Sequence, residues 1–434
     1  MADFSNVQMS LQRGAGAIQN NKYISAITNG LMSAMPITIV GALGSLVNSF
    51  PVQGYQDFLV NTGLKAITVI PSEITTNLLA IYVVYLIAAK FAESYDIDAT
   101  PAGILALMSF LIVTPFNYSE ANTLASLPAT WMGAPGLFTA FLVALLSAKV
   151  YTIFKIKGWV IKMPDGVPPT VSKSFSGLVP GLVLAVLAMV IRYVMTLTAF
   201  GDIHSFIFSV VAAPLTKLGG SFTALLVAMF AAQILWLVGV HGAMVVYSVF
   251  MPIWTPLGTE NLAAYNAGLE IPNIVSGSMF GMVVFMGSGA TLGLAMAMLR
   301  AKSEQYRVLG KLSLIPNICG INEPIIFGMP IIMNFTLAIP FILVPLIIAV
   351  TSYLGMLTGI LPYLPGIAVP LGVPVIINGL MAGGWRWAVY QALMIGVSYF
   401  VYLPFFKVMD KAAYKQEVEA QQQAEASELD SALV

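Results

Sequence analysis

Residues 324–385 read PIIFGMPIIMNFTLAIPFILVPLIIAVTSYLGMLTGILPYLPGIAVPLGVPVIINGLMAGGW and contain no Asp, Glu, Lys or Arg. A helix that crosses a bilayer needs about 20 mostly apolar residues, so this stretch has room for two or more membrane elements. Further uncharged runs cover residues 23–56, 99–119, 121–148, 174–191, 218–259, 271–299 and 387–406. Together they predict an all-α polytopic membrane protein with about ten transmembrane helices.

The composition excludes several classes of protein. Hydrophobic residues make up 58% of the chain and charged residues only 9%, against roughly 25% charged in soluble domains. The net charge is zero, and no dense block of Lys and Arg is present, so we expect no nucleic-acid partner. A single cysteine, Cys319, leaves no disulfide framework and no paired thiols for a metal. We therefore expect neither a metal site nor a cofactor.

Two stretches interrupt the pattern of long apolar spans. Residues 205–216 are apolar but too few to cross a bilayer, which predicts an interfacial helix or a re-entrant piece. Residues 311–335 contain several prolines and glycines, among them Pro316, Gly320 and Pro324, so we expect no continuous helix there. Irregular backbone at membrane depth is tolerated where protein buries it or where it lines a watery cavity. A broken re-entrant hairpin follows, and in transporters such hairpins commonly build the substrate site.

Basic residues predict the orientation, because Lys and Arg collect on the cytoplasmic side of membrane proteins. Connections rich in Lys and Arg alternate along the chain with connections that have few or none. The basic residues lie at Arg13 and Lys22, at Lys90, from Lys149 to Lys173, from Arg300 to Lys311 and from Lys407 to Lys415. Both termini are thus expected in the cytoplasm. The polar leader, residues 3–21, lacks the features of a cleavable signal peptide. The tail, residues 411–434, is typical of a solvated helix or a disordered end.

Glu323 is the most informative single residue. It lies in the segment NICGINEP, residues 317–324, with apolar neighbours at the expected membrane depth. A carboxylate there is costly, which makes it a functional hypothesis by default. It could accept hydrogen bonds from ligand hydroxyls, such as those of a sugar, or act as a general base. Asn317 and Asn322 offer donors and acceptors beside it. A structural carboxylate that caps a helix is the alternative.

His241 is the only ionisable side chain in the uncharged run 218–259. Imidazole titrates near neutrality, so a histidine beside a carboxylate could move a hydroxyl proton. A buried histidine that serves only the fold is the alternative. Gly239 and Gly242 would allow a ligand or a second backbone segment to approach closely.

Three tryptophans are candidates for stacking against the apolar face of a sugar ring. They are Trp236, Trp385 and Trp387. Tryptophan in membrane proteins also marks the water interface, and this is the alternative for each of them. Asn378 is a further candidate for ligand contact, and weaker ones are Glu73, Asn77, Asn117 and Glu120, which could equally be helix caps or loop surface.

Four segments carry a resemblance to a known family. Residues 317–328 read NICGINEPIIFG, residues 163–175 read MPDGVPPTVSKSF, residues 236–242 read WLVGVHG and residues 383–387 read GGWRW. They resemble enzyme IIC proteins of the lactose/cellobiose/diacetylchitobiose class of the phosphotransferase system. Among its members, a diacetylchitobiose- or cellobiose-type carrier is the nearest expectation.

The resemblance implies a permease in the cytoplasmic (inner) membrane of a bacterium. It implies a homodimer with an N-terminal scaffold, residues 1–200, and a C-terminal half with the hairpin and the sugar site, residues 201–410, followed by the tail. Glu323 and His241 would lie near the C6 hydroxyl of a β-linked disaccharide. The phosphoryl donor would be a cysteine of a separate cytoplasmic IIB protein, so Cys319 is expected to be a packed small residue.

Two other functions fit the composition and the hairpin equally well. In a proton- or sodium-coupled transporter, Glu323 and His241 would form a proton relay and the sugar would emerge unmodified. A passive channel or a sensor subunit would allow only downhill flux. The family motifs alone favour phosphorylation.

Overall fold

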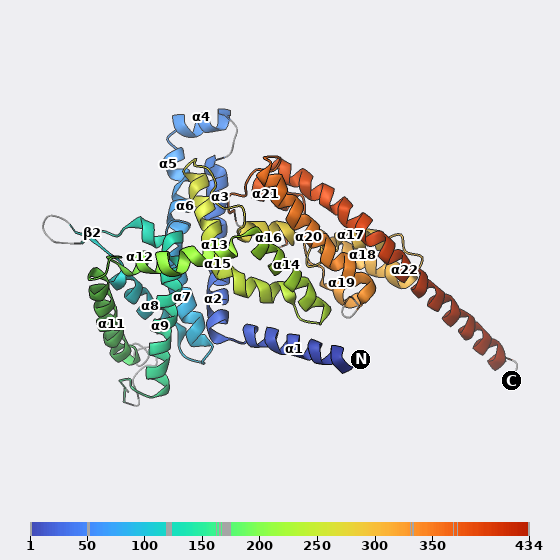
Figure 1. Ribbon diagram of the computed structural model, residues 1–434, viewed down its shortest axis with the longest axis horizontal. Helices are drawn as coiled ribbons and strands as arrows, with labels where there is room; N and C mark the ends of the chain where they lie inside the picture. The colour runs from blue at the N-terminus through green and yellow to red at the C-terminus, as the bar shows by residue number, and fades with distance from the viewer. Residues whose placement is uncertain are drawn as a thin grey trace.

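The chain is almost entirely helical (Figure 1). The computed structural model describes residues 2–49, 53–118, 124–161, 163–164, 166, 175–329, 331, 334–367, 369–370 and 372–432. Its strands β1 (Asn117–Tyr118) and β2 (Leu124–Ser126) form one short antiparallel hairpin. The predicted all-α class is confirmed.

The first part of the chain forms an upright bundle beside a horizontal N-terminal helix (Figure 1). Its elements are α1 (Ala2–Gln19), α2 (Lys22–Ser33), α3 (Met35–Ser49), α4 (Gln53–Asn61), α5 (Lys65–Thr68), α6 (Ile70–Thr75), α7 (Leu79–Glu93), α8 (Ala99–Val113), η1 (Ala129–Met132), η2 (Ala134–Gly136), α9 (Leu137–Ile156) and α11 (Leu178–Thr196). Helix α11 turns a broad apolar face outward, with Leu182, Val186 and Tyr193 exposed. Such a surface is stable in lipid but not in water.

The second part contains shorter and more irregular helices. They are α12 (Ile203–Ile207), the π-helical turn η3 (Phe208–Ala212), α13 (Ala213–Gly219), α14 (Phe222–Leu237), α15 (Gly242–Asn266), α16 (Gly277–Val283), α17 (Leu292–Met298), α18 (Glu304–Ile318), α19 (Glu323–Gly328), α20 (Phe335–Leu357), α21 (Ile377–Gly383) and α22 (Trp385–Ala432). Helix α22 runs along one side of this group and extends beyond it (Figure 1).

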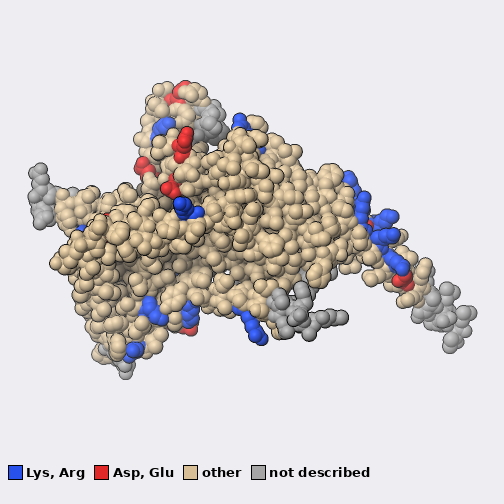
Figure 2. Space-filling view, viewed as in Figure 1, with Lys and Arg blue, Asp and Glu red and all other residues tan. Residues whose placement is uncertain are grey.

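Six helices of the described chain are long and apolar enough to cross a membrane. They are Lys22–Gly41, Lys65–Glu93, Ala134–Ile156, Leu178–Thr196, Phe335–Leu357 and Trp385–Gln423, and a bent pair, Ile203–Gly219 with Phe222–Leu237, could form a seventh. The expected total of about ten also counted shorter apolar elements, such as α8 and the pair α16 and α17. Charged side chains gather at the periphery, with a broad uncharged surface between them (Figure 2).

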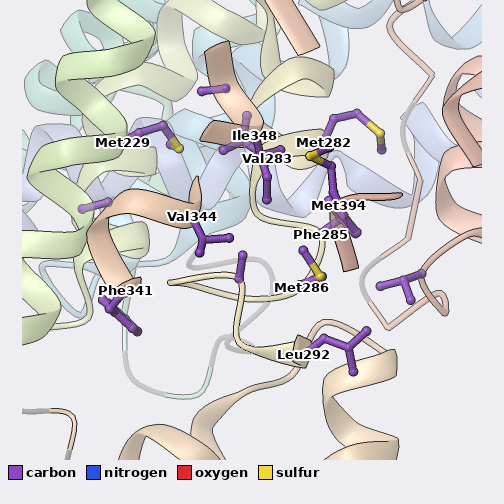
Figure 3. Close-up of a cluster of buried hydrophobic side chains, with 14 of the residues drawn as sticks. Met229, Met282, Val283, Phe285, Met286, Leu292, Phe341, Val344, Ile348 and Met394 are labelled. Atoms are coloured by element: carbon purple, nitrogen blue, oxygen red, sulfur yellow. The ribbon is translucent and has the colours of Figure 1, made fainter. Parts of the chain in front are cut away.

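Buried apolar side chains form two main clusters. One lies among α2, α7, α8 and α9, and it also includes Ile207 and Ala212 from the α12–η3 segment. The other lies among α14 to α22, and Figure 3 shows part of it, including Met282, Phe341 and Met394. Helix α15 joins the two clusters, because its Met251 belongs to the first and its Trp254 to the second.

Both interruptions expected from the sequence are present, with one correction. Residues 203–219 are helical and meet α14 at an angle of 67°, which fits a broken span or a re-entrant piece. In the second stretch, α18 continues through Pro316 to Ile318, so proline does not stop the helix there. The break falls at residues 319–322, where Gly320 has a φ of +76°. A left-handed backbone at glycine ends a helix at little cost.

Three buried polar side chains hold this break in place. The hydroxyl of Thr291 donates to Asn317 Oδ1 at 2.9 Å and accepts from Asn322 Nδ2 at 3.0 Å. The Asn322 amide also donates to the carbonyl of Ser288, and that of Asn317 donates to the carbonyl of Ser313. Buried hydrogen bonds of this kind are costly to lose, because each leaves an unpaired polar group.

The turn between α16 and α17 supplies the surface on which Asn322 packs. Gly287 and Gly289 both have a φ of +76° in this turn. Helix α22 fixes the turn from outside, since Ser398 Oγ donates to the carbonyl of Ala290 and Tyr402 Oη donates to that of Gly289, each at 2.6 Å. The end of α18 and the start of α19 are therefore held through this turn by α22.

Helix α22 also caps the start of α18 with two carboxylates. Asp410 accepts from the backbone N–H groups of Lys302 and Ser303, each at 3.0 Å. Glu417 accepts from the Ser303 hydroxyl at 2.7 Å and from the N–H groups of the next two residues. Carboxylates at a helix N-terminus satisfy unpaired donors and complement the helix dipole.

We expect Gly287→Ala to lower the thermal stability of the purified protein. The added Cβ would lie 2.4 Å from Asn322 Cγ, and a left-handed backbone costs an L-residue roughly 1–2 kcal/mol. Gly281→Ala is the matched control, because its Cβ meets nothing within 4 Å and alanine favours a helix. Equal unfolding temperatures in detergent for the two variants would contradict the described packing of the turn.

We expect Glu417→Gln to reduce the free energy of unfolding by about 1 kcal/mol, the usual loss when a helix cap is weakened. Glu419→Gln is the control, because within the described part of the chain Glu419 pairs only with exposed Lys415, at 3.5 Å, and such surface pairs contribute little. The shift of the unfolding midpoint in detergent measures both effects. No difference between the variants would mean that the cap contributes nothing.

Candidate functional site

Glu323 and His241 lie together, although more than eighty positions separate them in the chain. Glu323 begins α19, directly after the break, and His241 begins α15, so two helix starts face each other. Their Oε1 and Nε2 atoms are 3.8 Å apart, and the side chains are 44% and 40% exposed. This distance exceeds a hydrogen bond. Both atoms therefore keep hydrogen-bonding capacity for a third group.

The helix start fixes which nitrogen of His241 carries the proton. His241 is the N-cap of α15, and its Nδ1 accepts from the backbone N–H of Met244 at 3.2 Å. An accepting nitrogen has no proton, so the proton of the neutral ring resides on Nε2, which faces Glu323. Gly242 permits the tight packing behind this cap, because a Cβ there would lie 1.8 Å from the carbonyl oxygen of Ala232. The pair thus presents a donor beside an acceptor.

Trp236 supports the histidine ring. The two ring centroids are 4.3 Å apart, at an interplanar angle of 47°. Trp236 is only 3% exposed, and its Nε1 has no hydrogen-bond partner among the described residues. The indole therefore offers little surface for stacking with a ligand in this conformation.

The two asparagines predicted as ligand contacts hold the break that precedes Glu323. Asn317 and Asn322 are both buried, and their amides take part in the hydrogen bonds that hold the break between α18 and α19. In this arrangement they orient the backbone that carries Glu323.

The remaining predicted contacts lie elsewhere. Trp387 is fully buried, and its Nε1 donates to the carbonyl of Pro362 at 2.9 Å. Trp385 is exposed and lines an apolar groove of about 520 Å³ between α20 and α22. The structure does not place either indole in contact with the Glu323–His241 pair. The exposed position of Trp385 is consistent with the alternative, an anchor at the water interface of the membrane.

Asn378 lies in α21, a short helix connected to the site through its preceding turn. The backbone N–H of Val375 donates to the carbonyl of Ile318 at 2.8 Å, next to the break. The Oε1 atom of Gln391 accepts from the N–H groups of Ile376 and Gly379, and its amide donates to Asn378 Oδ1 at 3.2 Å. Ile376 has a φ of +75°, which is unusual for a β-branched residue. Strain of this kind often accompanies functional sites.

The weaker candidates belong to the first part of the chain. Glu73 lies in α6, Asn77 lies between α6 and α7, and Asn117 donates to Ser126 within the β-hairpin. Glu120 and most of the motif at residues 163–175 fall outside the described residues. Among the residues that the structure describes, no group of three His, Cys, Asp or Glu side chains could hold a metal ion.

Sequence reasoning missed two glutamines, one that contacts the turn before His241 and one on α14, the helix that leads to this turn. Gln12 of α1 donates to the carbonyl of Val238 at 2.7 Å, in the turn that leads to His241. Gln233 of α14 is fully buried, with both amide atoms unpartnered among the described residues. No motif marks a glutamine on an amphipathic helix, but a single amide in the apolar run 218–259 was a usable signal for Gln233.

The second histidine of the chain, His204, was also not singled out from the sequence. His204 of α12 is fully buried, its Nε2 is 2.9 Å from Thr114 Oγ1, and its ring stacks on Trp131 with centroids 5.0 Å apart. These contacts lie in the first cluster, away from the pair, and they are typical of a structural histidine.

Comparisons with known proteins agree with the motifs. Residues 28–345 match the family model described as "Phosphotransferase system, EIIC". The chain is 38% identical over 418 residues to the lichenan permease IIC component of Bacillus subtilis (strain 168), covering 93% of this chain and 92% of the relative. It is 37% identical over 420 residues to the cellobiose-specific EIIC component of Geobacillus stearothermophilus, covering 93% of each.

A solved structure supports the same assignment. The crystal structure of the transporter ChbC, the IIC component from an N,N'-diacetylchitobiose-specific phosphotransferase system, matches with a TM-score of 0.88 and 34% sequence identity. The match covers 94% of this chain and 98% of ChbC. The expected family and the multi-pass helical fold are thereby confirmed. The chain belongs to the EIIC family of the phosphotransferase system, whose members are membrane-embedded sugar permease components.

Proposed function

We propose that this EIIC component imports a β-linked disaccharide and presents it for phosphorylation at C6. The relatives named for cellobiose and N,N'-diacetylchitobiose support the substrate class. The observation that carries the proposal is the Glu323–His241 pair, in which a carboxylate and an N–H donor face each other at the start of two helices, beside a break in the backbone.

In the proposed reaction, Glu323 accepts a hydrogen bond from the C6 hydroxyl and takes its proton. The hydroxyl oxygen forms the new bond to phosphorus, the phosphorus–sulfur bond on the IIB cysteine breaks, and the thiolate leaves. His241, through Nε2–H, donates to the sugar oxygen and holds it in place. Phosphoryl transfer depends mainly on positioning and charge stabilisation, so two well-placed groups suffice on the acceptor side.

The partners follow from the same proposal. The disaccharide enters from outside, and a phosphorylated cytoplasmic IIB protein reaches it from within. We place both termini on the cytoplasmic side of a bacterial inner membrane, because Lys and Arg collect on that side. Figure 1 is consistent with both termini on one side, since α1 and the end of α22 lie opposite α4. We further propose a homodimer with residues 1–200 as its scaffold. No bound cofactor is required, because the phosphoryl group arrives on the partner.

The rival function is a transporter coupled to protons or sodium. Membership in the EIIC family does not favour it. Uptake into vesicles separates the two, because an ionophore would abolish accumulation in a coupled transporter. Accumulation by an EIIC component requires phosphorylated IIB instead.

We expect Glu323→Gln to reduce the rate of sugar phosphorylation about a hundredfold or more, the range of a lost general base. The assay uses membrane vesicles, phosphorylated IIB and labelled cellobiose, N,N'-diacetylchitobiose or lactose, with sugar phosphate as the readout. Glu93→Gln is the control, because among the described residues Glu93 forms an ion pair only with the partly exposed Lys90, at 2.8 Å. A Glu323→Gln protein that works at the wild-type rate would exclude Glu323 from the mechanism.

We expect His241→Asn to separate the two tasks of this histidine. Asparagine is among the best N-cap residues, so the start of α15 and the unfolding temperature should be preserved. The Nε2–H donor is lost, and the phosphorylation rate should fall about tenfold or more, since this hydrogen bond holds the attacking oxygen in place. A variant with unchanged turnover would limit His241 to capping.

A further inference from the structure

The aromatic ring that faces outward beside the pair is Phe327, not a tryptophan. Phe327 follows Glu323 by four positions on α19, so both side chains lie on one face of that helix. Phe327 is 66% exposed, whereas Ile325 and Ile326, which lie between Glu323 and Phe327 in the chain, are buried. The exposed face of α19 thus carries one carboxylate and one aromatic ring.

Ring contacts connect Phe327 to the histidine. The centroids of Phe327 and Trp236 are 6.4 Å apart at 65°, an edge-to-face contact, and Trp236 in turn lies 4.3 Å from His241. Glu323, His241, Trp236 and Phe327 are thus neighbours in a row, in which Trp236 is the buried support and the other three side chains are accessible. Of the Trp236 and Phe327 rings, only the Phe327 ring is exposed enough to contact a ligand.

Lipid is a poor neighbour for this face. A carboxylate turned toward hydrocarbon is costly, and Glu323 is half-exposed on the same side of the same short helix. Water or a polar ligand is therefore the better neighbour. An exposed phenyl ring has no favourable contact with water, and in ligand sites such rings provide apolar surface between a few hydrogen-bonding groups.

We propose that Phe327 is the stacking platform for the sugar ring whose C6 hydroxyl meets Glu323. This inference rests on the function proposed above. One helical turn separates the two side chains by about 6 Å along the axis, comparable with the span of one pyranose ring and its exocyclic carbon. The C–H face of the ring packs on the phenyl group, and the exocyclic hydroxyl then reaches the carboxylate.

The test is a binding measurement on purified full-length protein in detergent, by titration calorimetry with cellobiose, N,N'-diacetylchitobiose and lactose. For the sugar that the wild type binds, Phe327→Ala and Phe327→Leu should each weaken affinity about tenfold, the amount that a lost aromatic contact is worth. Phe327→Tyr should bind like the wild type. Phe400→Ala is the matched control, because Phe400 is an exposed phenylalanine on α22, distant in the chain, and it should have no effect.

Two outcomes overturn the inference. Wild-type affinity in Phe327→Leu would show that apolar bulk suffices and that no aromatic platform exists. Wild-type affinity in Phe327→Ala, together with lost turnover in Glu323→Gln, would remove the platform but leave the proposed function standing. If the wild type binds none of these sugars, or if Glu323→Gln turns over normally, the proposed function fails instead. Unfolding temperatures of all variants identify any loss of affinity that comes from misfolding. A Phe327→Tyr protein that folds like the wild type but binds the sugar about tenfold more weakly would also contradict the inference, because its ring is retained.

Discussion

The hydroxyl of Thr291, shared between Asn317 and Asn322, is the contact on which the site depends. It accepts from one asparagine and donates to the other, and so ties the two ends of the break between α18 and α19 to a single point. Within the break, the N–H groups of Cys319, Gly320 and Ile321 donate back to carbonyl groups at the end of α18, and the carbonyl of Asn322 accepts from α19. The Thr291 contact joins these two bonded ends, and its loss would leave buried amides unpaired and loosen the position of Glu323.

Helix α22 extends this constraint through much of the second cluster. Its side chains contact the turn before α17 through Ser398 and Tyr402, the start of α18 through Asp410 and Glu417, and the start of α21 through Gln391. Each contact lies at a helix end or a turn, where backbone N–H or C=O groups have no partner within a helix. Such groups need another hydrogen-bond partner when they are buried. The elements that carry Glu323 are therefore fixed to one long helix.

The sequence predicted the parts of this arrangement that a local pattern encodes. A carboxylate in a proline- and glycine-rich apolar segment and a histidine in an uncharged run identified Glu323 and His241, and the structure places them 3.8 Å apart. Tryptophans have no such specificity, since an indole suits a buried core, an interface or a ligand equally well, and Trp387 is buried. Thr291, Gln12 and Phe327 could not be found, because their roles depend on packing between distant segments or on which side of a short helix faces outward.

The pair also lies where two groups of elements meet. Glu323 is tied to α22 and the second cluster, whereas His241 begins α15, the helix that joins both clusters and that contacts α2 through Thr28 and the carbonyl of Ser248. The turn before His241 is also held by Gln12 of α1. Trp236, which packs on His241, and Ile325 and Ile326, which follow Glu323 on α19, all belong to the second cluster, so a rigid displacement of the second cluster against the first would carry the carboxylate and the imidazole together. Transport by alternating access requires such a displacement, and the contacts that must change are those from α1 and α2, whereas the hydroxyl-binding geometry of the pair can be kept.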